Sequence, residues 1–183
     1  IFSRCFGKKM KRILVTAIGG DISQSIAQCM RKNKEDVFLV GTDINDKHGG
    51  SLVVDKFLTV PSANEPKYID SLANIVSKND IDVTIPVNEN ELKVIVNSSQ
   101  DLEIIQCGRE IVNIGLDKLE TIKSLGTLGI NVPWTINADD EKPYDYPCLI
   151  KPRFSSGSRS IFIVNSNAEA EFYSEKYPKC VFQ

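Results

Sequence analysis

The hydrophobic positions in the first part of the chain follow two alternating patterns. Short, predominantly apolar runs occur at 12–17, 37–41, 57–60 and 83–85. Such runs are typical of parallel strands that are buried on both faces. Between them, apolar residues recur three or four positions apart, which predicts a helix after each of these strands except the second. Strands that alternate with helices predict a doubly wound α/β domain with a parallel sheet, extending over residues 11–115.

Turn and cap residues mark the ends of several of these elements. Asp21 is placed to cap the first helix, and Pro61 and Pro86 close the third and fourth strands. The apolar positions expected on the three helices are Ile22, Ile26, Cys29 and Met30, then Tyr68, Ile69, Leu72, Ile75 and Val76, then Leu92, Ile95 and Val96. The apolar pairs at 104–105 and 111–112 are too short to assign.

From residue 116 onward the pattern changes. Asp117 is a candidate N-cap for a helix whose apolar positions are Leu119, Ile122 and Leu125, and Gly129 ends that helix. An acidic loop follows at 137–145, and a helix is expected near 168–177. The final residues, 180–183, form a strand at which the chain stops. We therefore expect a second, incomplete unit over 116–183.

The segment 146–164 carries the most suggestive chemistry. Two apolar runs flank a polar turn, which predicts two strands joined by a flexible loop. Lys151 ends the first strand, and Arg153 and Arg159 add forked donors suited to phosphate. Backbone amides and hydroxyls with little side-chain bulk come from Ser155, Ser156, Gly157 and Ser158. The segment fits a phosphate clamp, although an ordinary hairpin with a solvated lysine is the simpler interpretation.

Composition and charge narrow the function classes. The chain of 183 residues is 42% hydrophobic and 25% charged, which is typical of a globular protein. Its net charge of −2 gives no general attraction to nucleic acid or to an anionic membrane. No apolar run is long enough to cross a bilayer. The five cysteines are odd in number and widely spaced, which favours reduced thiols in the cytoplasm.

The turn at 16–23 offers an alternative, an NAD-binding module that uses Gly19, Gly20 and Asp43. The dinucleotide fingerprint needs G-x-G-x-x-G, but Ala17 stands at its first glycine, and the last is also missing. The sequence also places an aspartate at the helix start, where a pyrophosphate would dock. The fingerprint is therefore incomplete.

Taken in order, these segments resemble the ATP-grasp proteins, in particular the branch of the carbamoyl-phosphate-synthase large subunit. The matching segments are 14–22, 41–43, 85–86, 117–118, 129–133, 147–152 and 156–159. The resemblance implies a pre-ATP-grasp α/β domain over 11–115, followed by the first lobe of an ATP-grasp domain over 116–183. The chain departs from the synthase in lacking its duplicated halves and in having a loop with fewer glycines.

By this resemblance, the nucleotide phosphates would be bound by two lysines and one loop: Lys118, Lys151, Ser155, Ser156, Gly157, Ser158 and Arg159. Lys123 is a substitute candidate for Lys118. Related enzymes transfer the γ-phosphoryl group of ATP to a carboxylate, and an amine or another nucleophile then attacks the acyl phosphate. Their Mg²⁺ ligands lie in the second lobe, so we expect no catalytic or metal-binding residue in this chain, which alone would be inactive.

The expected partners are therefore ATP, Mg²⁺, a small-molecule carboxylate and a nucleophile, with neither nucleic acid nor membrane. A homodimer is compatible with the resemblance. A non-catalytic ATP-binding or scaffold protein that keeps the ATP-grasp shape is a second hypothesis from a different class.

Overall fold

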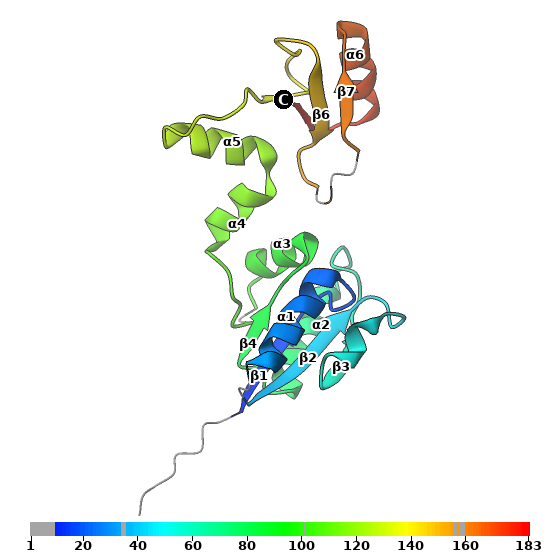
Figure 1. Cartoon of the computed structure of the whole chain (residues 1–183), viewed down its shortest axis with the longest axis vertical. Coiled ribbons are helices and arrows are strands. Elements are labelled where there is room, and N and C mark those ends of the chain that lie inside the picture. Colours follow the sequence, from blue (N-terminus) through cyan, green and yellow to red (C-terminus); the bar gives the residue numbers. More distant parts are fainter. Residues whose placement is uncertain (1–9, 34–35, 101, 156, 158–159) are drawn as a thin grey trace, which may run out of the picture. The chain divides into compact units, whose positions relative to one another are not determined.

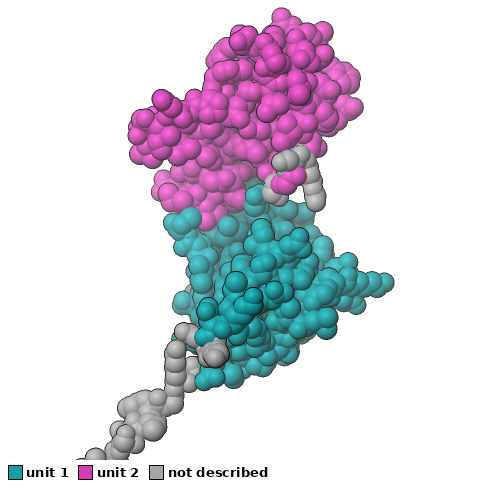
Figure 2. Space-filling model, in the orientation of Figure 1, with its two compact units in different colours: residues 1–107 teal, residues 108–183 magenta. Residues whose placement is uncertain are grey.

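The computed structural model describes residues 10–33, 36–100, 102–155, 157 and 160–183. The chain divides into two compact units, Ile1–Cys107 and Gly108–Gln183 (Figure 2). Helix α4 (Arg109–Leu116) belongs to the second unit. The functional domain boundary near residue 115 stays a prediction.

The first unit is built on a parallel four-stranded sheet (Figure 1). Its strands are β1 (Lys11–Val15), β2 (Val37–Asp43), β3 (Lys56–Thr59) and β4 (Val83–Ile85), in the order β3-β2-β1-β4. Every pairing within it is parallel. The predicted α/β fold class and all four predicted strands are confirmed.

Helices cover both faces of this sheet. They are α1 (Asp21–Lys32), α2 (Tyr68–Lys78) and α3 (Glu89–Asn97), and a short 3-10 turn, η1, spans Gly49–Leu52. One hydrophobic core joins alternate residues of β1 and β2 to α1, and the other core joins the intervening residues to α2 and α3. Because successive strand residues point to opposite faces, the two cores lie on either side of the sheet.

Helix α1 differs from the prediction at its start and on its buried face. Gly20 takes the N-cap position, so Asp21 is the first helical residue and the predicted cap is wrong. The fully buried residues are Ser23 and Ala27, whereas the predicted apolar position Ile22 is 68% exposed. Small side chains let the helix approach the sheet closely, and the Ser23 hydroxyl donates to the backbone oxygen of Thr16 at 3.0 Å.

The second unit contains an antiparallel four-stranded sheet in the order β5-β8-β6-β7. Its strands are β5 (Ile136–Asn137), β6 (Cys148–Pro152), β7 (Phe162–Val164) and β8 (Cys180–Phe182). Helix α6 (Asn167–Lys176) packs on the sheet through one core cluster. The hairpin, the last helix and the last strand were all predicted.

Helix α5 (Lys118–Thr127) begins and ends as the sequence indicates. The Asp117 carboxylate accepts hydrogen bonds from the backbone amides of Leu119 at 3.0 Å and Glu120 at 3.4 Å, as an N-cap should. Gly129 follows the last turn with φ of 75°. Helix α5 therefore presents its first residue, Lys118, at a fixed position.

Candidate functional site

Lys151 lies on the face of β6 opposite the core. Cys148 and Ile150 of this strand are buried in the cluster beneath α6, so the period of two turns Leu149 and Lys151 to the other face. The Lys151 ammonium donates to Oε1 of Gln183 at 2.5 Å. The lysine is therefore held on the sheet, where the hairpin prediction placed it.

Lys118 is tied to the loop that follows β6. Its Nζ donates to the backbone oxygen of Ser155 at 2.6 Å and to the Ser155 hydroxyl at 3.1 Å. Its backbone amide donates to the oxygen of Arg153 at 3.1 Å. Helix α5 and the hairpin loop, distant in sequence, thus meet at this lysine.

The ionised form of Lys151 is disfavoured by its surroundings. Burial lowers the pKa of Lys151 below its usual range, and the positive charge of Lys118 acts in the same direction. In the described part of the chain, neither amine has a carboxylate within ion-pair distance; both contact neutral oxygens. Two partly buried ammonium groups without a counter-charge favour the binding of an anion.

An apolar surface adjoins the Lys151 side of the sheet. Leu149 and Ile163 are paired across β6 and β7, and they are 37% and 62% exposed. Leu149 shares the face of β6 that carries Lys151, and its cross-strand partner lies on the same face. This face can accept a ligand with a charged part and a flat apolar part.

The predicted loop is described only in part. Ser155 contacts Lys118. Gly157 is exposed with φ of 69°, and no atom of the described residues lies within 4 Å of the place that a Cβ on it would occupy. Ser156, Ser158 and Arg159 lie outside the described residues. The proposed closure of this loop over phosphate therefore stays a prediction.

Arg153 forms ion pairs with two carboxylates at the start of α5. Its Nε donates to the Asp117 carboxylate at 2.7 Å, and its Nη2 lies 3.4 Å from Glu120. Burial pushes the pKa of Asp117 upward, but Arg153 and the helix amides outweigh it, so that pKa lies below its usual range. The guanidinium thus joins the hairpin to the start of α5, and the role of Arg153 as a phosphate donor stays a prediction.

Three further residues complete the surroundings. Lys123, the substitute candidate, is 60% exposed and pairs with Glu120 at 3.2 Å. Gln183 bridges Lys151 and Thr135, donating to the Thr135 hydroxyl at 2.9 Å. A glutamine at a strand end carries no sequence pattern, so Gln183 could be found only from the structure.

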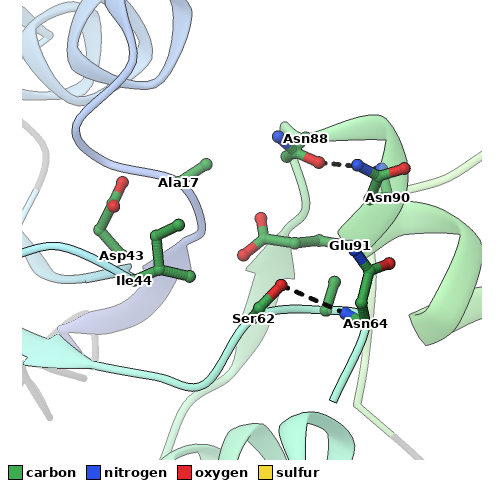
Figure 3. Close-up of a pocket in the computed structure, with 9 residues that line it drawn as sticks. Ala17, Asp43, Ile44, Ser62, Asn64, Asn88, Asn90 and Glu91 are labelled. Atoms are coloured by element: carbon green, nitrogen blue, oxygen red, sulfur yellow. Dashed lines mark hydrogen bonds between the residues drawn. The ribbon is translucent and has the colours of Figure 1, made fainter. Parts of the chain in front are cut away.

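The first unit has a separate pocket of about 180 Å³ (Figure 3). It lies at the carboxyl ends of the strands, where open α/β sheets bind ligands. Its lining includes Ala17 after β1, Asp43 of β2, Ser62 after β3 and Asn88 after β4. Glu91 of α3 also lines it.

In the glycine turn after β1, a backbone amide is already hydrogen-bonded to an aspartate of the same unit. Asp43 Oδ2 accepts from the amide of Gly19 at 2.9 Å, and a Cβ on Gly19 would lie 2.9 Å from that oxygen. A dinucleotide would need this amide for its pyrophosphate and this carboxylate for its ribose. The contact therefore weighs against the NAD-binding alternative.

The described residues were also searched for metal sites and membrane spans. No group of three or more His, Cys, Asp or Glu lies together there in a way that could hold a metal ion. No helix in the same residues is long and apolar enough to span a membrane.

A doubly wound unit followed by an antiparallel lobe is the fold that the resemblance to ATP-grasp proteins led us to expect. Residues 116–183 match the ATP-grasp domain model. Residues 13–108 match the PylC-like, N-terminal domain model, and the chain belongs to that family. The expected ATP-grasp family is thereby confirmed. A comparison with curated proteins found no match.

Solved structures show the same fold at low identity. N5-carboxyaminoimidazole synthetase from Staphylococcus aureus, complexed with ADP, aligns with a TM-score of 0.72 and 18% identity, covering 94% of this chain and 47% of that one. L-amino acid ligase from Bacillus licheniformis aligns with a TM-score of 0.73 and 16% identity, covering 94% of this chain and 43% of that one. A third similar structure is the biotin carboxylase domain of the Hydrogenobacter thermophilus 2-oxoglutarate carboxylase, in complex with MgADP and bicarbonate. It aligns with a TM-score of 0.73 and 15% identity, covering 94% of this chain and 44% of that one. The chain spans about half the length of these proteins.

Proposed function

We propose that the protein is an ATP-dependent carboxylate ligase, of which this chain supplies the first domain and the phosphate-binding lobe. The observation that carries the proposal is the pair of partly buried amines on Lys118 and Lys151. Neither has a carboxylate partner among the described residues, and the charge of Lys118 helps to lower the pKa of Lys151. The fold shared with a synthetase and a ligase supports the same class.

ATP, when bound, supplies the γ-phosphoryl group that converts a carboxylate into an acyl phosphate for attack by an amine or another nucleophile. Lys151 and Lys118 bind the phosphate oxygens and neutralise charge as it shifts during transfer. Lys151 is held beforehand by Gln183, whereas Lys118 exchanges its contacts with Ser155 for phosphate oxygens. Leu149 and Ile163 supply the apolar surface for the base.

Lys118 also connects phosphate binding to the loop. In this structure its ammonium is bonded to both oxygens of Ser155. Phosphate oxygens would replace the Ser155 oxygens, and the loop from Ser155 to Arg159, with Ser156, Gly157 and Ser158, would then close over the anion. Closure would exclude water, which would otherwise hydrolyse an acyl phosphate.

Substitution of each lysine tests the proposal in the longest natural form of the protein. A charge-assisted hydrogen bond is worth about 1.5–3 kcal/mol, so Lys151→Ala and Lys118→Ala should each weaken ATP affinity or turnover about ten- to a hundredfold. Binding is measured by titration with ATP, and turnover by ADP release with a panel of carboxylates.

Lys123→Ala is the matched control, because this exposed lysine of the same helix pairs with Glu120 rather than with the loop. Unchanged ATP affinity and turnover in both test variants would overturn the proposal. ATP binding that depends on the lysines, but with no ADP formed from any carboxylate, would instead support the non-catalytic scaffold. The Mg²⁺ requirement, the carbamoyl-phosphate-synthase branch, a homodimer and a cytoplasmic location stay predictions.

A further inference from the structure

Gln183 directly follows β8, the strand that lies between β5 and β6. It exchanges two backbone hydrogen bonds with Leu149 of β6, at 2.9 Å from its own amide and 2.7 Å from the Leu149 amide. The two residues are therefore a cross-strand pair, and their side chains leave the same face of the sheet. Lys151 is two residues beyond Leu149, so it shares this face and lies diagonally across from Gln183, within reach of a long side chain.

Thr135 lies on the other side of Gln183. Ile136 pairs with Phe182 in the antiparallel register of β5 and β8, so the residue before Ile136 is level with Gln183. The Gln183 side chain thus connects a threonine next to one neighbouring strand with a lysine on the other. A side-chain amide suits this place, because it carries an acceptor and a donor at its two ends.

The orientation of the Gln183 amide is fixed from both ends. A lysine ammonium has donors only, so the atom that Lys151 contacts at 2.5 Å must be the amide oxygen, Oε1. The Thr135 hydroxyl donates its single proton to the backbone oxygen of Pro133 at 3.3 Å. Toward Gln183 it can therefore only accept, and Nε2 lies 2.9 Å away. A reversed amide would lose both contacts.

This contact leaves the charge of Lys151 available for a ligand. Gln183 is neutral, so it restrains the ammonium without cancelling its charge, and it uses only one of the three N–H donors. An acceptor also favours the charged form of the amine, against the burial and the Lys118 charge that lower its pKa. A carboxylate at this position would instead form an ion pair with Lys151 and compete with an incoming anion.

We propose that Gln183 is the positioning residue for Lys151: its amide oxygen, oriented by the Thr135 hydroxyl, holds the ammonium on the face where the nucleotide phosphate binds. The inference rests on the proposed function and deepens it, because it names the residues that order the phosphate-binding lysine. Thr135 acts only through Gln183.

Titration with ATP, in the longest natural form of the protein, tests this arrangement. Gln183→Leu removes both amide contacts, so Lys151 must be ordered as the ligand binds, and we expect about two- to tenfold weaker ATP binding. Thr135→Val keeps the size of the side chain and frees the amide to turn, so its loss should be smaller. The double variant should be no worse than Gln183→Leu alone, because Thr135 acts through Gln183.

Thr127→Val is the matched control, because the hydroxyl of this exposed residue of α5 also donates to a backbone oxygen, that of Ser124 at 2.7 Å. It should leave ATP affinity unchanged. Equal ATP affinity of Gln183→Leu and the unmodified protein would overturn the inference, as would losses that add in the double variant.

The titration of Lys151 is a second readout, which a general loss of stability would not move. NMR of its side chain without nucleotide should show a lower pKa in Gln183→Leu, because the charged form loses an acceptor. Gln183→Glu should raise that pKa through the added carboxylate. Lys118 of α5, the other charge that acts on Lys151, is unaltered in both variants.

Gln183→Glu should nevertheless bind ATP more weakly than Gln183→Leu, because its negative charge repels the phosphates. An unchanged pKa of Lys151 in both variants would overturn the inference. ATP binding by Gln183→Glu as tight as in the unmodified protein would do the same.

The outcomes are distinguishable from those for the ligase proposal. If Lys151→Ala weakens ATP binding but Gln183→Leu and Thr135→Val do not, the positioning role alone fails. If the pKa of Lys151 responds to Gln183 while ATP binding and turnover ignore Lys118 and Lys151, the restraint on the lysine stands and the ligase proposal fails.

Discussion

Lys151 and Glu91 present the same physical situation with opposite charge. Burial opposes the ionised form of each side chain, and a neighbour of like charge, Lys118 or Asp43, adds to the effect. A bound anion would supply the opposite charge at Lys151, whereas at Glu91 the hydroxyls of Thr16 and Tyr68 act against the rise in pKa. Such groups are expected where ligands bind, because burial keeps their interactions strong.

The raised pKa of Glu91 predicts how stability changes with pH. The folded chain keeps this proton to a higher pH than the unfolded chain, so in that interval folding binds a proton and the free energy of unfolding falls as pH rises. Glu91→Gln removes this contribution. Relative to the unmodified chain, the variant should therefore gain stability as pH rises upward from the ordinary titration range of a glutamate.

Urea unfolding at a series of pH values measures this difference, and Glu89→Gln serves as the exposed control. A difference between Glu91→Gln and the unmodified chain that stays constant with pH would contradict the assigned burial of the charge.

At the scale of elements, Asp117 joins helix α5 to the hairpin. Its carboxylate caps the helix through two amides and pairs with Arg153 at 2.7 Å. One residue therefore sets both the start of the helix, with Lys118, and the position of the loop after β6.

Substitutions at Asp117 should separate these two roles. Asp117→Asn keeps a capping oxygen but loses the charge, whereas Asp117→Ala loses both. A helix cap contributes about 1 kcal/mol to the free energy of unfolding, and a hydrogen bond to a charged group contributes about 1.5–3 kcal/mol. We therefore expect Asp117→Ala to lower the free energy of unfolding by about 2–4 kcal/mol. Asp117→Asn should cost clearly less.

Chemical denaturation gives these free energies, and Lys123→Ala, which removes an exposed pair, should change stability by less than about 0.5 kcal/mol. Equal costs for the two Asp117 variants would show that the cap contributes nothing.

The elements that the sequence predicted are those whose signal is local. The run 37–43 is predictable because a parallel strand buried on both faces needs consecutive apolar residues. The buried face of α1 could not be predicted in this way. Ser23 and Ala27 pack there because their side chains are small, and the spacing of hydrophobic residues carries no information about side-chain size. Asp21 failed as a cap because Gly20 occupies that position.

At the scale of the whole molecule, the hydrophobic cores are separate. In the described part of the chain, each core cluster takes its residues from one unit only. Ile150 of the second unit is 1% exposed and Leu72 of the first is fully buried. Truncation of either side chain should therefore destabilise first the unit to which that residue belongs.

We expect Ile150→Ala to cost about 2–5 kcal/mol and to lower hydrogen-exchange protection within 108–183. Leu72→Ala should lower protection within 10–107 by a similar amount. Native-state hydrogen exchange read by mass spectrometry measures both. Equal loss of protection in both units from either substitution would show that they unfold together.

The lysine pair and the pocket of the first unit differ in how far they could be predicted from the sequence. Lys118 and Lys151 belong to short motifs, so the resemblance could point to both lysines before their contacts were known. The pocket of the first unit gathers residues from the ends of several strands and from α3, and no spacing along the chain relates Glu91 to Asp43. Only the parallel arrangement of the sheet brings them to one edge.

Strand β8 has a consequence for how the second unit is made. Among the described strands it comes after β5, β6 and β7 in sequence, yet it lies between β5 and β6, and within the described sheet β5 has no other strand partner. A nascent polypeptide leaving the ribosome must therefore hold β5 and one edge of β6 unpaired until Cys180–Phe182 emerges. A premature stop codon before Cys180 would leave those edges open to pairing with other chains.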